Sequence, residues 1–196
     1  MINIYIVPVV REIYNKQIEY CYDKKLFSFL KFSFNKYALK FDLNKDLNLI
    51  IISGGNDLPN FKKTLSNIEK DNLSQKAFSF AKKNGIPLVG ICGGAQFIAK
   101  KNKFLITKTL KHVGKHKIFW KKIGSIKTNK YPREINSFHN YKIKKVKKGF
   151  ATLALANDKS VEGFINYKKK ILGIMWHPER DNNFKKFNKE IIKSIL

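Results

Sequence analysis

The sequence predicts an α/β protein in which helices cover both faces of a mostly parallel central sheet. Three short apolar runs support this prediction, at residues 47–52, 86–91 and 171–176. Apolar runs of this length are typical of strands that are buried on both faces, as in parallel sheets. Segments with helical periodicity stand between the runs, and strands that alternate with helices favour parallel pairing.

The remaining elements are predicted from periodicity and from end signals. Asn72 and Gln75 have capping-box spacing at the start of one helix, and Gly85 followed by Pro87 ends that helix. In chain order we expect a strand at 3–10, a helix within 17–34, a strand at 47–52, a helix over about 72–84, a strand at 86–91, a helix from about 94, short strands with polar turns over 104–170, a strand at 171–176 and an amphipathic helix carrying Phe184, Phe187, Ile191 and Ile195.

Length and composition limit the number of domains and the class of protein that the sequence can encode. A chain of 196 residues with 43% hydrophobic residues is expected to form one domain, residues 1–196, with its own core. No apolar stretch approaches the roughly 18 residues that a membrane span needs. The first ten residues read as a strand, because they lack a basic leader and a small-residue cleavage site. With only Cys21 and Cys92 as cysteines, we expect a reducing cytoplasmic location and no disulfide.

The chain is strongly basic, with a net charge of +26 from 40 Lys and Arg against 14 Asp and Glu. Almost all of this charge is lysine, and only Arg11, Arg133 and Arg180 are arginines, the better bidentate ligands of phosphate. Lysine, asparagine, isoleucine, phenylalanine and tyrosine are abundant together, as AT-rich coding favours. We therefore interpret the excess as compositional drift, with a basic pocket for an anionic ligand as the alternative. Neither nucleic acid nor a membrane is an expected partner, and a homodimer is compatible with the sequence.

Cys92 is the main candidate nucleophile. In open α/β sheets ligands bind beyond the carboxyl ends of the strands, and Ser53, Cys92 and His177 all stand at such ends. A cysteine on a strand-to-helix turn faces the helix N-terminus, which favours the thiolate. Gly93 and Gly94 tolerate a tight turn and leave room for a substrate. A buried structural cysteine is the alternative.

Two further segments supply partners for such a nucleophile. His177 and Glu179 are two residues apart in an extended segment, so both side chains leave on the same side and the carboxylate can orient the imidazole. The alternative is a surface pair without mutual contact. Gly54 and Gly55 follow a buried strand, and their backbone N–H groups, together with that of Gly93, could bind an oxyanion.

These segments together resemble a known family. The pattern Gly90-Ile91-Cys92-Gly93-Gly94-Ala95-Gln96, with His177-Pro178-Glu179 some 85 residues later, is similar to that of class I glutamine amidotransferases. The resemblance extends over residues 50–180. It implies a flavodoxin-like three-layer sandwich and a Cys-His-Glu triad formed by Cys92, His177 and Glu179.

Within the family, "SGGND" and "INSFHN" resemble the branch of free-standing gamma-glutamyl hydrolases. "HVGKH", "NSFHN" and "GIMWHPER" are similar to hydrolases that cleave gamma-glutamyl-CDP-amidate during phosphoramidate decoration of surface polysaccharide. The resemblance implies attack by Cys92 on the gamma-glutamyl carbonyl, a glutamyl thioester and its hydrolysis by water that His177 activates, with no cofactor. Gly93 departs from this branch, where arginine or another larger residue often follows the nucleophile.

Several functions stay open on the sequence. The substrate could instead be gamma-glutamyl-GABA or glutamine itself. The chain could be a glutaminase subunit that supplies ammonia to a separate synthetase, or a basic binding protein built on a retired amidotransferase scaffold.

For the remaining candidate residues, the sequence allows both a functional and a purely structural role. Gln96, Asn136, Ser137 and His139 could bind the glutamyl substrate, whereas packing or turn stabilisation is the alternative. Glu162, on a predicted strand, could meet a substrate ammonium group or be an exposed strand residue. His112 and His116 have the spacing of metal ligands on a helix, but Gly114 and the strand-like pattern around them argue against a helix. We therefore expect no metal there.

Overall fold

The central sheet of the computed structural model, which describes residues 1–109, 112–121 and 131–196, has a parallel core. Its strands, in spatial order, are β4 (Tyr37–Lys40), β1 (Ile2–Val7), β5 (Leu49–Ile52), β6 (Leu88–Ile91) and β13 (Ile171–Ile174). Every neighbouring pair in this set is parallel. The predicted α/β class with a mostly parallel central sheet is confirmed, and all three apolar runs form its inner strands.

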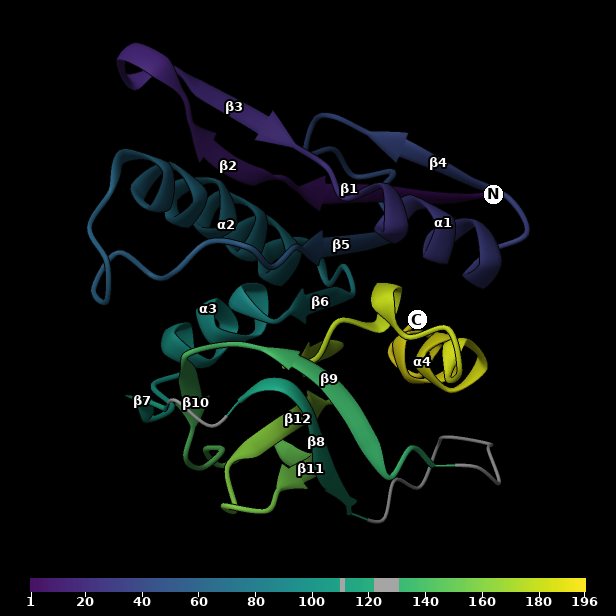
Figure 1. Cartoon of the computed structure of the whole chain (residues 1–196). Coiled ribbons are helices and arrows are strands. Elements are labelled where there is room, and N and C mark those ends of the chain that lie inside the picture. The colour runs from purple at the N-terminus through teal and green to yellow at the C-terminus, as the bar shows by residue number, and fades with distance from the viewer. Residues whose placement is uncertain (110–111, 122–130) are drawn as a thin grey trace.

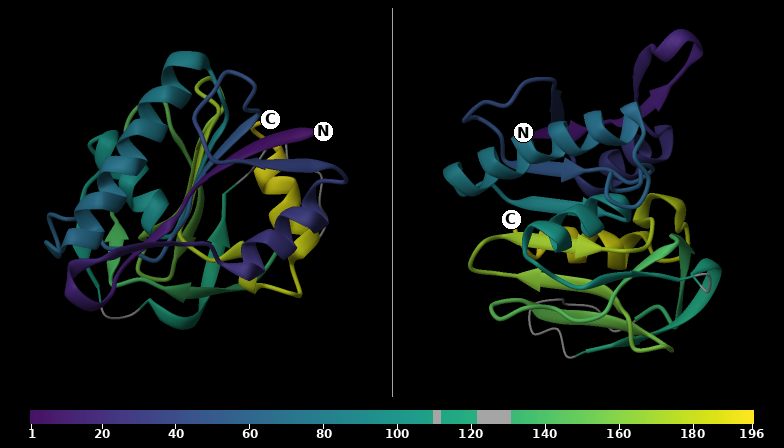
Figure 2. Two further views of the ribbon diagram at one scale, coloured as in Figure 1. Left: turned by 90° about the horizontal axis from the view of Figure 1, so that it is seen from above. Right: turned by 90° about the vertical axis from the view of Figure 1, so that its left-hand side faces the viewer.

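An antiparallel extension continues the sheet beyond β13. It contains β12 (Val161–Asn166), β11 (Ala151–Ala156), β8 (Val113–Trp120) and β9 (Glu134–Phe138), while β10 (Tyr141–Ile143) and β7 (Ile106–Lys108) pair at its side. These are the short strands expected over 104–170, of which residues 110–111 and 122–130 lie outside the described part. A separate hairpin, β2 (Val9–Glu12) with β3 (Ile18–Cys21), projects from the molecule (Figure 2).

Helices cover the parallel sheet on both faces, which gives three layers (Figures 1 and 2). Helices α2 (Leu65–Asn84) and α3 (Gly93–Lys101) lie on one face, and α1 (Lys24–Ser33) and α4 (Lys185–Lys193) lie on the other. Each face has its own apolar cluster: Phe29, Leu30, Phe187 and Ile191 pack on one side, and Ala77, Ala81, Phe97 and Ile98 on the other. Two 3₁₀ turns complete the fold, η1 (Tyr14–Lys16) and η2 (Pro178–Arg180).

Two predicted helix starts are wrong. The helix expected within 17–34 begins only at α1, where Asp23 caps it by accepting a hydrogen bond from the N–H of Lys25 at 2.8 Å. Residues 18–21 form β3 instead. Helix α2 begins at Leu65 rather than near 72, with Thr64 as its cap. Its end is as predicted, because Gly85 adopts the left-handed conformation with φ +66°.

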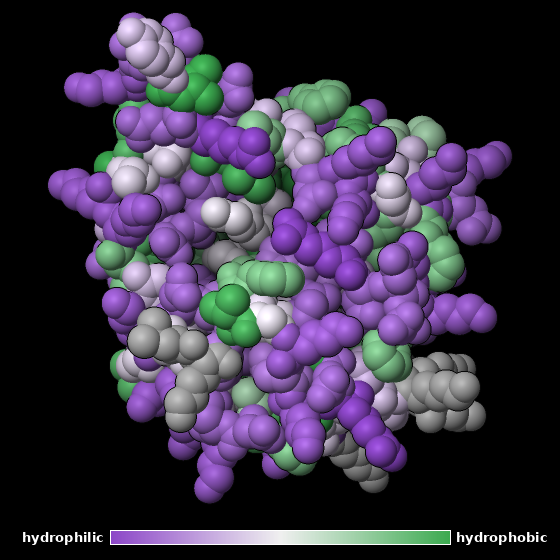
Figure 3. Space-filling model, viewed as in Figure 1, coloured by the Kyte–Doolittle hydropathy of each residue, from purple (hydrophilic) through white to green (hydrophobic). Residues whose placement is uncertain are grey.

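The surface is predominantly hydrophilic. On the face shown in Figure 3, hydrophilic residues cover most of the area and hydrophobic residues occur only in small groups. Both cysteines are free thiols. Within the described ranges, no helix has the length and apolar character that crossing a membrane requires.

Candidate active site

Cys92 occupies a strained turn between β6 and α3. Its backbone has φ +50° and ψ −108°, a conformation that a residue with a side chain rarely adopts. Hydrogen bonds on both sides hold this turn: the N–H of Cys92 donates to the carbonyl of Ile174 at 2.8 Å, and the N–H of Gln96 donates to the carbonyl of Cys92 at 3.0 Å. Such a turn between a strand and a helix is the arrangement that presents a nucleophile at a sheet edge.

His177 lies between Cys92 and Glu179. Its Nδ1 is 2.6 Å from Oε1 of Glu179, and both side chains are buried. Since Nδ1 is engaged there, Nε2 is the nitrogen left for the side-chain hydrogen bond with Cys92. Burial of the ring lowers the pKa of His177, but the hydrogen bonds to Cys92 and Glu179 and the negative charges of both outweigh burial and raise this pKa to about 10. The ring therefore holds its proton at neutral pH.

Asn136 fixes the backbone of the same histidine. From β9, its Nδ2 donates to the carbonyl of His177 and its Oδ1 accepts from the N–H of His177, both at 3.0 Å. Asn136 does not line the cavity at Cys92. This contact holds the main chain of the histidine in place.

Glycines allow the close approach of three segments: the loop after β5, the turn at Cys92 and the segment at His177. A Cβ atom added at Gly54 would lie 3.1 Å from both Cβ of Cys92 and Cε1 of His177. Gly55 has φ +99°, which favours glycine. A Cβ at Gly93 would lie 2.7 Å from the backbone carbonyl of Asn56, so this conformation has no room for the larger residue that often follows the nucleophile in the resembling branch.

A cavity of about 180 Å³ opens at Cys92. It is lined by Gly55, Asn56, Asp57, Cys92, Gly93, Gln96, Phe138, His139, Asn140, His177 and Arg180. Two predicted substrate residues, Gln96 and His139, thus face the cavity, and Nε2 of Gln96 also donates to the carbonyl of Tyr141 at 3.1 Å. Ser137 is fully buried and is not among the lining residues.

A larger basic cavity lies next to the first. It has a volume of about 1020 Å³ and is lined by Lys115, Lys117, Ile118, Phe119, Tyr131, Arg133, Glu134, Ile135, Asn136 and residues 180–184. Arg180 lines both cavities. Its guanidinium also binds Asp23 at 3.0 Å and lies 3.8 Å from Glu179, so it reaches both the catalytic segment and α1.

Glu162 is neither exposed nor part of the cavity around Cys92. It is fully buried on β12, where its carboxylate faces His112, His116 and His139. The exposed position that the sequence allowed is therefore wrong. His112 and His116 lie on an extended segment, as predicted, and not on a helix.

The sequence as a whole matches the family described as Glutamine amidotransferase class-I over residues 15–194. The chain belongs to this family of enzymes. It is 35% identical to gamma-glutamyl-CDP-amidate hydrolase of Campylobacter jejuni over 158 residues, which is 80% of this chain and 74% of the relative. It is 29% identical to a subunit of the glutamine-hydrolyzing GMP synthase of Methanocaldococcus jannaschii, over 78% of this chain and 74% of that one.

Solved structures of this family share the fold. A glutamine amidotransferase from Thermotoga maritima superposes with a TM-score of 0.68 at 12% identity, covering 99% of this chain and 96% of the other. A Thermoplasma acidophilum protein described as a subunit of GMP synthase superposes with a TM-score of 0.72 at 20% identity, covering 100% and 92%. The three layers and the mostly parallel sheet are thus those of class I glutamine amidotransferases.

Two residues that support the site were not identified from the sequence. Lys70 is buried on α2, and its Nζ donates to the carbonyls of Val7 and Pro8, at 3.1 and 2.5 Å, and to Oγ of Ser53 at 2.8 Å. Burial lowers its pKa well below the ordinary value. Asn56 exchanges two 2.9 Å hydrogen bonds with the backbone of Val10. Lys70 stands seven residues before the buried Ala77, and this helical spacing is a signal of its burial.

Proposed function

We propose that this chain is a cysteine hydrolase that cleaves the amide bond of a gamma-glutamyl compound through a glutamyl thioester. The observation that carries the proposal is the buried Cys92–His177–Glu179 arrangement next to a cavity. The sulfur of Cys92 attacks the gamma-carbonyl carbon, and the carbonyl oxygen becomes an oxyanion. Backbone N–H groups of Gly54, Gly55 and Gly93 are the proposed donors to that oxygen.

The proton on His177 has a defined path in this reaction. The imidazolium gives its proton to the leaving nitrogen as the C–N bond breaks, and the amine departs. Water then attacks the thioester, His177 takes the proton of that water, and the C–S bond breaks to release glutamate and regenerate the thiolate. Glu179 stays ionised throughout and stabilises the protonated ring.

The proposed substrate is gamma-glutamyl-CDP-amidate, which would yield glutamate and cytidine diphosphoramidate. The similarity to the Campylobacter jejuni hydrolase supports this choice. The basic cavity supports it independently, because Lys115, Lys117, Arg133 and Arg180 line a space next to the nucleophile that suits a diphosphate. Phe119 and Tyr131 offer aromatic surfaces for a base. Such a product would serve phosphoramidate modification of surface polysaccharide, and a cytoplasmic location would fit both the nucleotide substrate and the free thiols.

A second candidate function is that of a glutaminase subunit for a separate synthetase. The similarity to a subunit of the Methanocaldococcus jannaschii GMP synthase favours it. A gamma-glutamyl-GABA hydrolase would share the chemistry, but the single carboxylate of the GABA part would offer the cations of the basic cavity less negative charge than a diphosphate does.

A substrate panel tests these proposals. We expect the purified protein to release glutamate from gamma-glutamyl-CDP-amidate faster than from gamma-glutamyl-GABA or glutamine, with no added partner. Cys92→Ser should abolish release, and Cys21→Ser, which changes the other cysteine, should not. Full activity in Cys92→Ser would contradict the nucleophile, and glutamine hydrolysis that depends on an added synthetase would favour the subunit function.

The basic cavity is tested with Arg133→Gln. This variant should raise KM for the nucleotide conjugate about 10-fold, because a charge-assisted contact to phosphate contributes about 1.5–3 kcal/mol. KM for glutamine should stay unchanged. Equal effects on both substrates would contradict a nucleotide subsite while leaving the hydrolase function intact.

A further inference from the structure

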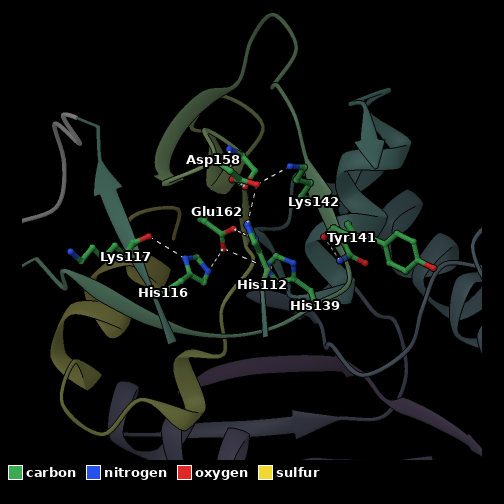
Figure 4. A network of polar contacts seen from close by, with 10 residues as sticks. His112, His116, Lys117, His139, Tyr141, Lys142, Asp158 and Glu162 are labelled. Carbon is green, nitrogen blue, oxygen red and sulfur yellow. Dashed lines mark hydrogen bonds and ion pairs between the residues drawn. The ribbon is translucent and has the colours of Figure 1, made fainter. Parts of the chain in front are cut away.

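Four side chains that commonly bind metals converge in the antiparallel part of the sheet. His112 directly precedes β8, His116 lies on β8, His139 follows β9 and Glu162 lies on β12. One ligand atom from each lies within 4.8 Å of the other three. Figure 4 shows the three imidazole rings gathered around the Glu162 carboxylate. Strands distant in sequence thus meet at one point.

The backbone at Gly114 accounts for the proximity of His112 and His116. Residues four apart on an extended strand are about 13 Å apart, since a strand rises about 3.3 Å per residue. Here the two ring centroids are 4.8 Å apart. Gly114, between them, has φ +98°, a left-handed value that interrupts the extended path. The glycine that argued against a metal in the sequence therefore permits the bend that brings both rings to Glu162.

The outer nitrogens of two of the rings have hydrogen-bond acceptors behind them. Nε2 of His112 is 3.3 Å from Oδ2 of Asp158, and Nδ1 of His116 is 3.1 Å from the carbonyl of Lys117. A neutral ring that donates its N–H to this outer acceptor keeps its inner nitrogen unprotonated, as a metal ligand requires. In this tautomer the inner nitrogens of His112 and His116 present lone pairs to Glu162. Histidine ligands of metals commonly have such a carboxylate or carbonyl behind them.

These inner lone pairs face a carboxylate that also offers only lone pairs. Nδ1 of His112 is 3.0 Å from Oε1 of Glu162, while Nε2 of His139 and of His116 are 3.5 and 3.8 Å from Oε2. Within the described residues, Nδ1 of His112, Nε2 of His116 and Oε1 of Glu162 have no well-aligned hydrogen bond. Ligand atoms at about 2.0–2.2 Å from a tetrahedral zinc ion are about 3.4 Å from each other, close to these separations.

We propose that Nδ1 of His112, Nε2 of His116, Nε2 of His139 and the carboxylate of Glu162 bind one divalent transition-metal ion. Three imidazoles and one carboxylate suit zinc best, with cobalt as a spectroscopic substitute. The ion replaces the repulsion between facing lone pairs by four bonds. Four protein ligands close the coordination sphere, so the ion has a structural role: it ties the β8–β9 ladder to β12. This inference does not depend on the proposed hydrolase function.

The first experiment uses the fact that the chain has only four histidines. Full-length Cys92→Ser protein, which lacks the thiolate that could bind zinc, is stripped with a chelator and titrated with zinc. Imidazole nitrogen NMR should show three histidines shifting up to one equivalent while His177 stays in place. Cobalt in place of zinc should give the intense visible bands of tetrahedral ligation. Shifts in fewer than three rings, or in His177 alone, would overturn the site.

The second experiment measures bound metal by mass spectrometry in matched variants of the same background. His116→Gln changes the least buried ligand, and His177→Gln changes the histidine outside the cluster. The expected zinc content is about one per chain in the parent and in His177→Gln, and about a tenth of that or less in His116→Gln. Zinc should raise the thermal unfolding midpoint of the parent and not that of His116→Gln. Equal zinc content in the two variants would overturn the proposal. That result is expected if the three histidines and Glu162 form a network of imidazolium–carboxylate contacts and bind no metal.

Discussion

Replacing Asn136 by alanine tests whether β9 holds His177, the proposed acid and base of the reaction, in position. The change removes two hydrogen bonds of 3.0 Å and leaves the N–H and C=O of His177 without these partners, at a residue only 6% exposed. The carbonyl of His177 keeps a hydrogen bond from the N–H of Arg180, so the N–H of His177 is the group left unsatisfied. An unsatisfied buried polar group costs about 1–3 kcal/mol, and the free energy of unfolding should fall by about this amount. Freed from this contact, the ring can shift by about 1 Å, which can lower kcat about 100-fold.

The assay compares urea unfolding with steady-state kinetics on a small chromogenic gamma-glutamyl anilide, which does not reach the basic cavity. The expected signature is a fall in kcat of about 10–100-fold with KM unchanged, because Asn136 does not line the cavity at Cys92. Asn188→Ala is the matched control. The indole N–H of Trp176 donates to Asn188 at 2.9 Å next to the same segment. Among the described residues, the hydrogen bonds to the backbone of His177 come from Asn136 and Arg180 and not from Asn188. Asn188→Ala should therefore lose stability and keep kcat.

Two results would refute this reasoning. One is an Asn136→Ala protein that loses stability but retains its kcat, since the position of His177 would then not depend on the contact. The other is an equal loss of kcat in Asn188→Ala, since general loosening of the segment would then explain both variants.

Three further changes have defined outcomes. Lys70→Met removes the hydrogen bond to the carbonyl of Pro8, whereas the carbonyl of Val7 keeps hydrogen bonds from Ser53, so urea unfolding should show a loss of about 1–3 kcal/mol; a loss below about 0.5 kcal/mol would contradict the role of this lysine. Cys92 and Glu179 together raise the pKa of His177 in the folded protein, so the stabilisation from pairing the imidazolium with these two groups is complete below about pH 6.5 and is lost as pH rises through about 10. Urea unfolding of Glu179→Gln should therefore differ most from the parent near pH 6 and least near pH 10, and a constant difference would contradict the ion pair. Gly93→Ala places a Cβ 2.7 Å from the carbonyl of Asn56, so kcat should fall at least about 10-fold with little change in KM. An unchanged kcat would show that the loop at Asn56 moves aside without disturbing the proposed oxyanion site.

Strong local signals made the centre of the fold predictable. The apolar runs at 47–52, 86–91 and 171–176 leave few alternatives to buried strands, and they form β5, β6 and β13. Parallel pairing then requires their carboxyl ends to meet, so the proximity of Cys92 and His177 follows from the same signals. The contact between His177 and Glu179 was predicted from their two-residue spacing in an extended segment, and it forms although Glu179 lies in the 3₁₀ turn η2.

The failures have physical causes. Residues 18–34 keep helical apolar spacing across Asp23, and only the capping geometry shows that the helix begins there. The first turns of α2 are polar, and one buried position is Lys70, so the apolar pattern starts later than the helix does. Asn136 bonds to a residue 41 positions away, a relation that depends on how β9 lies against the segment after β13. Local periodicity contains no such information.

The antiparallel extension connects the two sites. Strand β9 carries Asn136, which holds His177, and it ends directly before His139, one of the four clustered ligands. Strand β12 carries Glu162 and pairs with β13, the strand that leads to His177. A metal ion that ties β9 to β12 would thus constrain β9 directly, and β13 through its pairing with β12, and both strands position His177. Protein interiors are close-packed and deform little. The position of the His177 imidazole therefore depends on the antiparallel extension as well as on the carboxylate of Glu179.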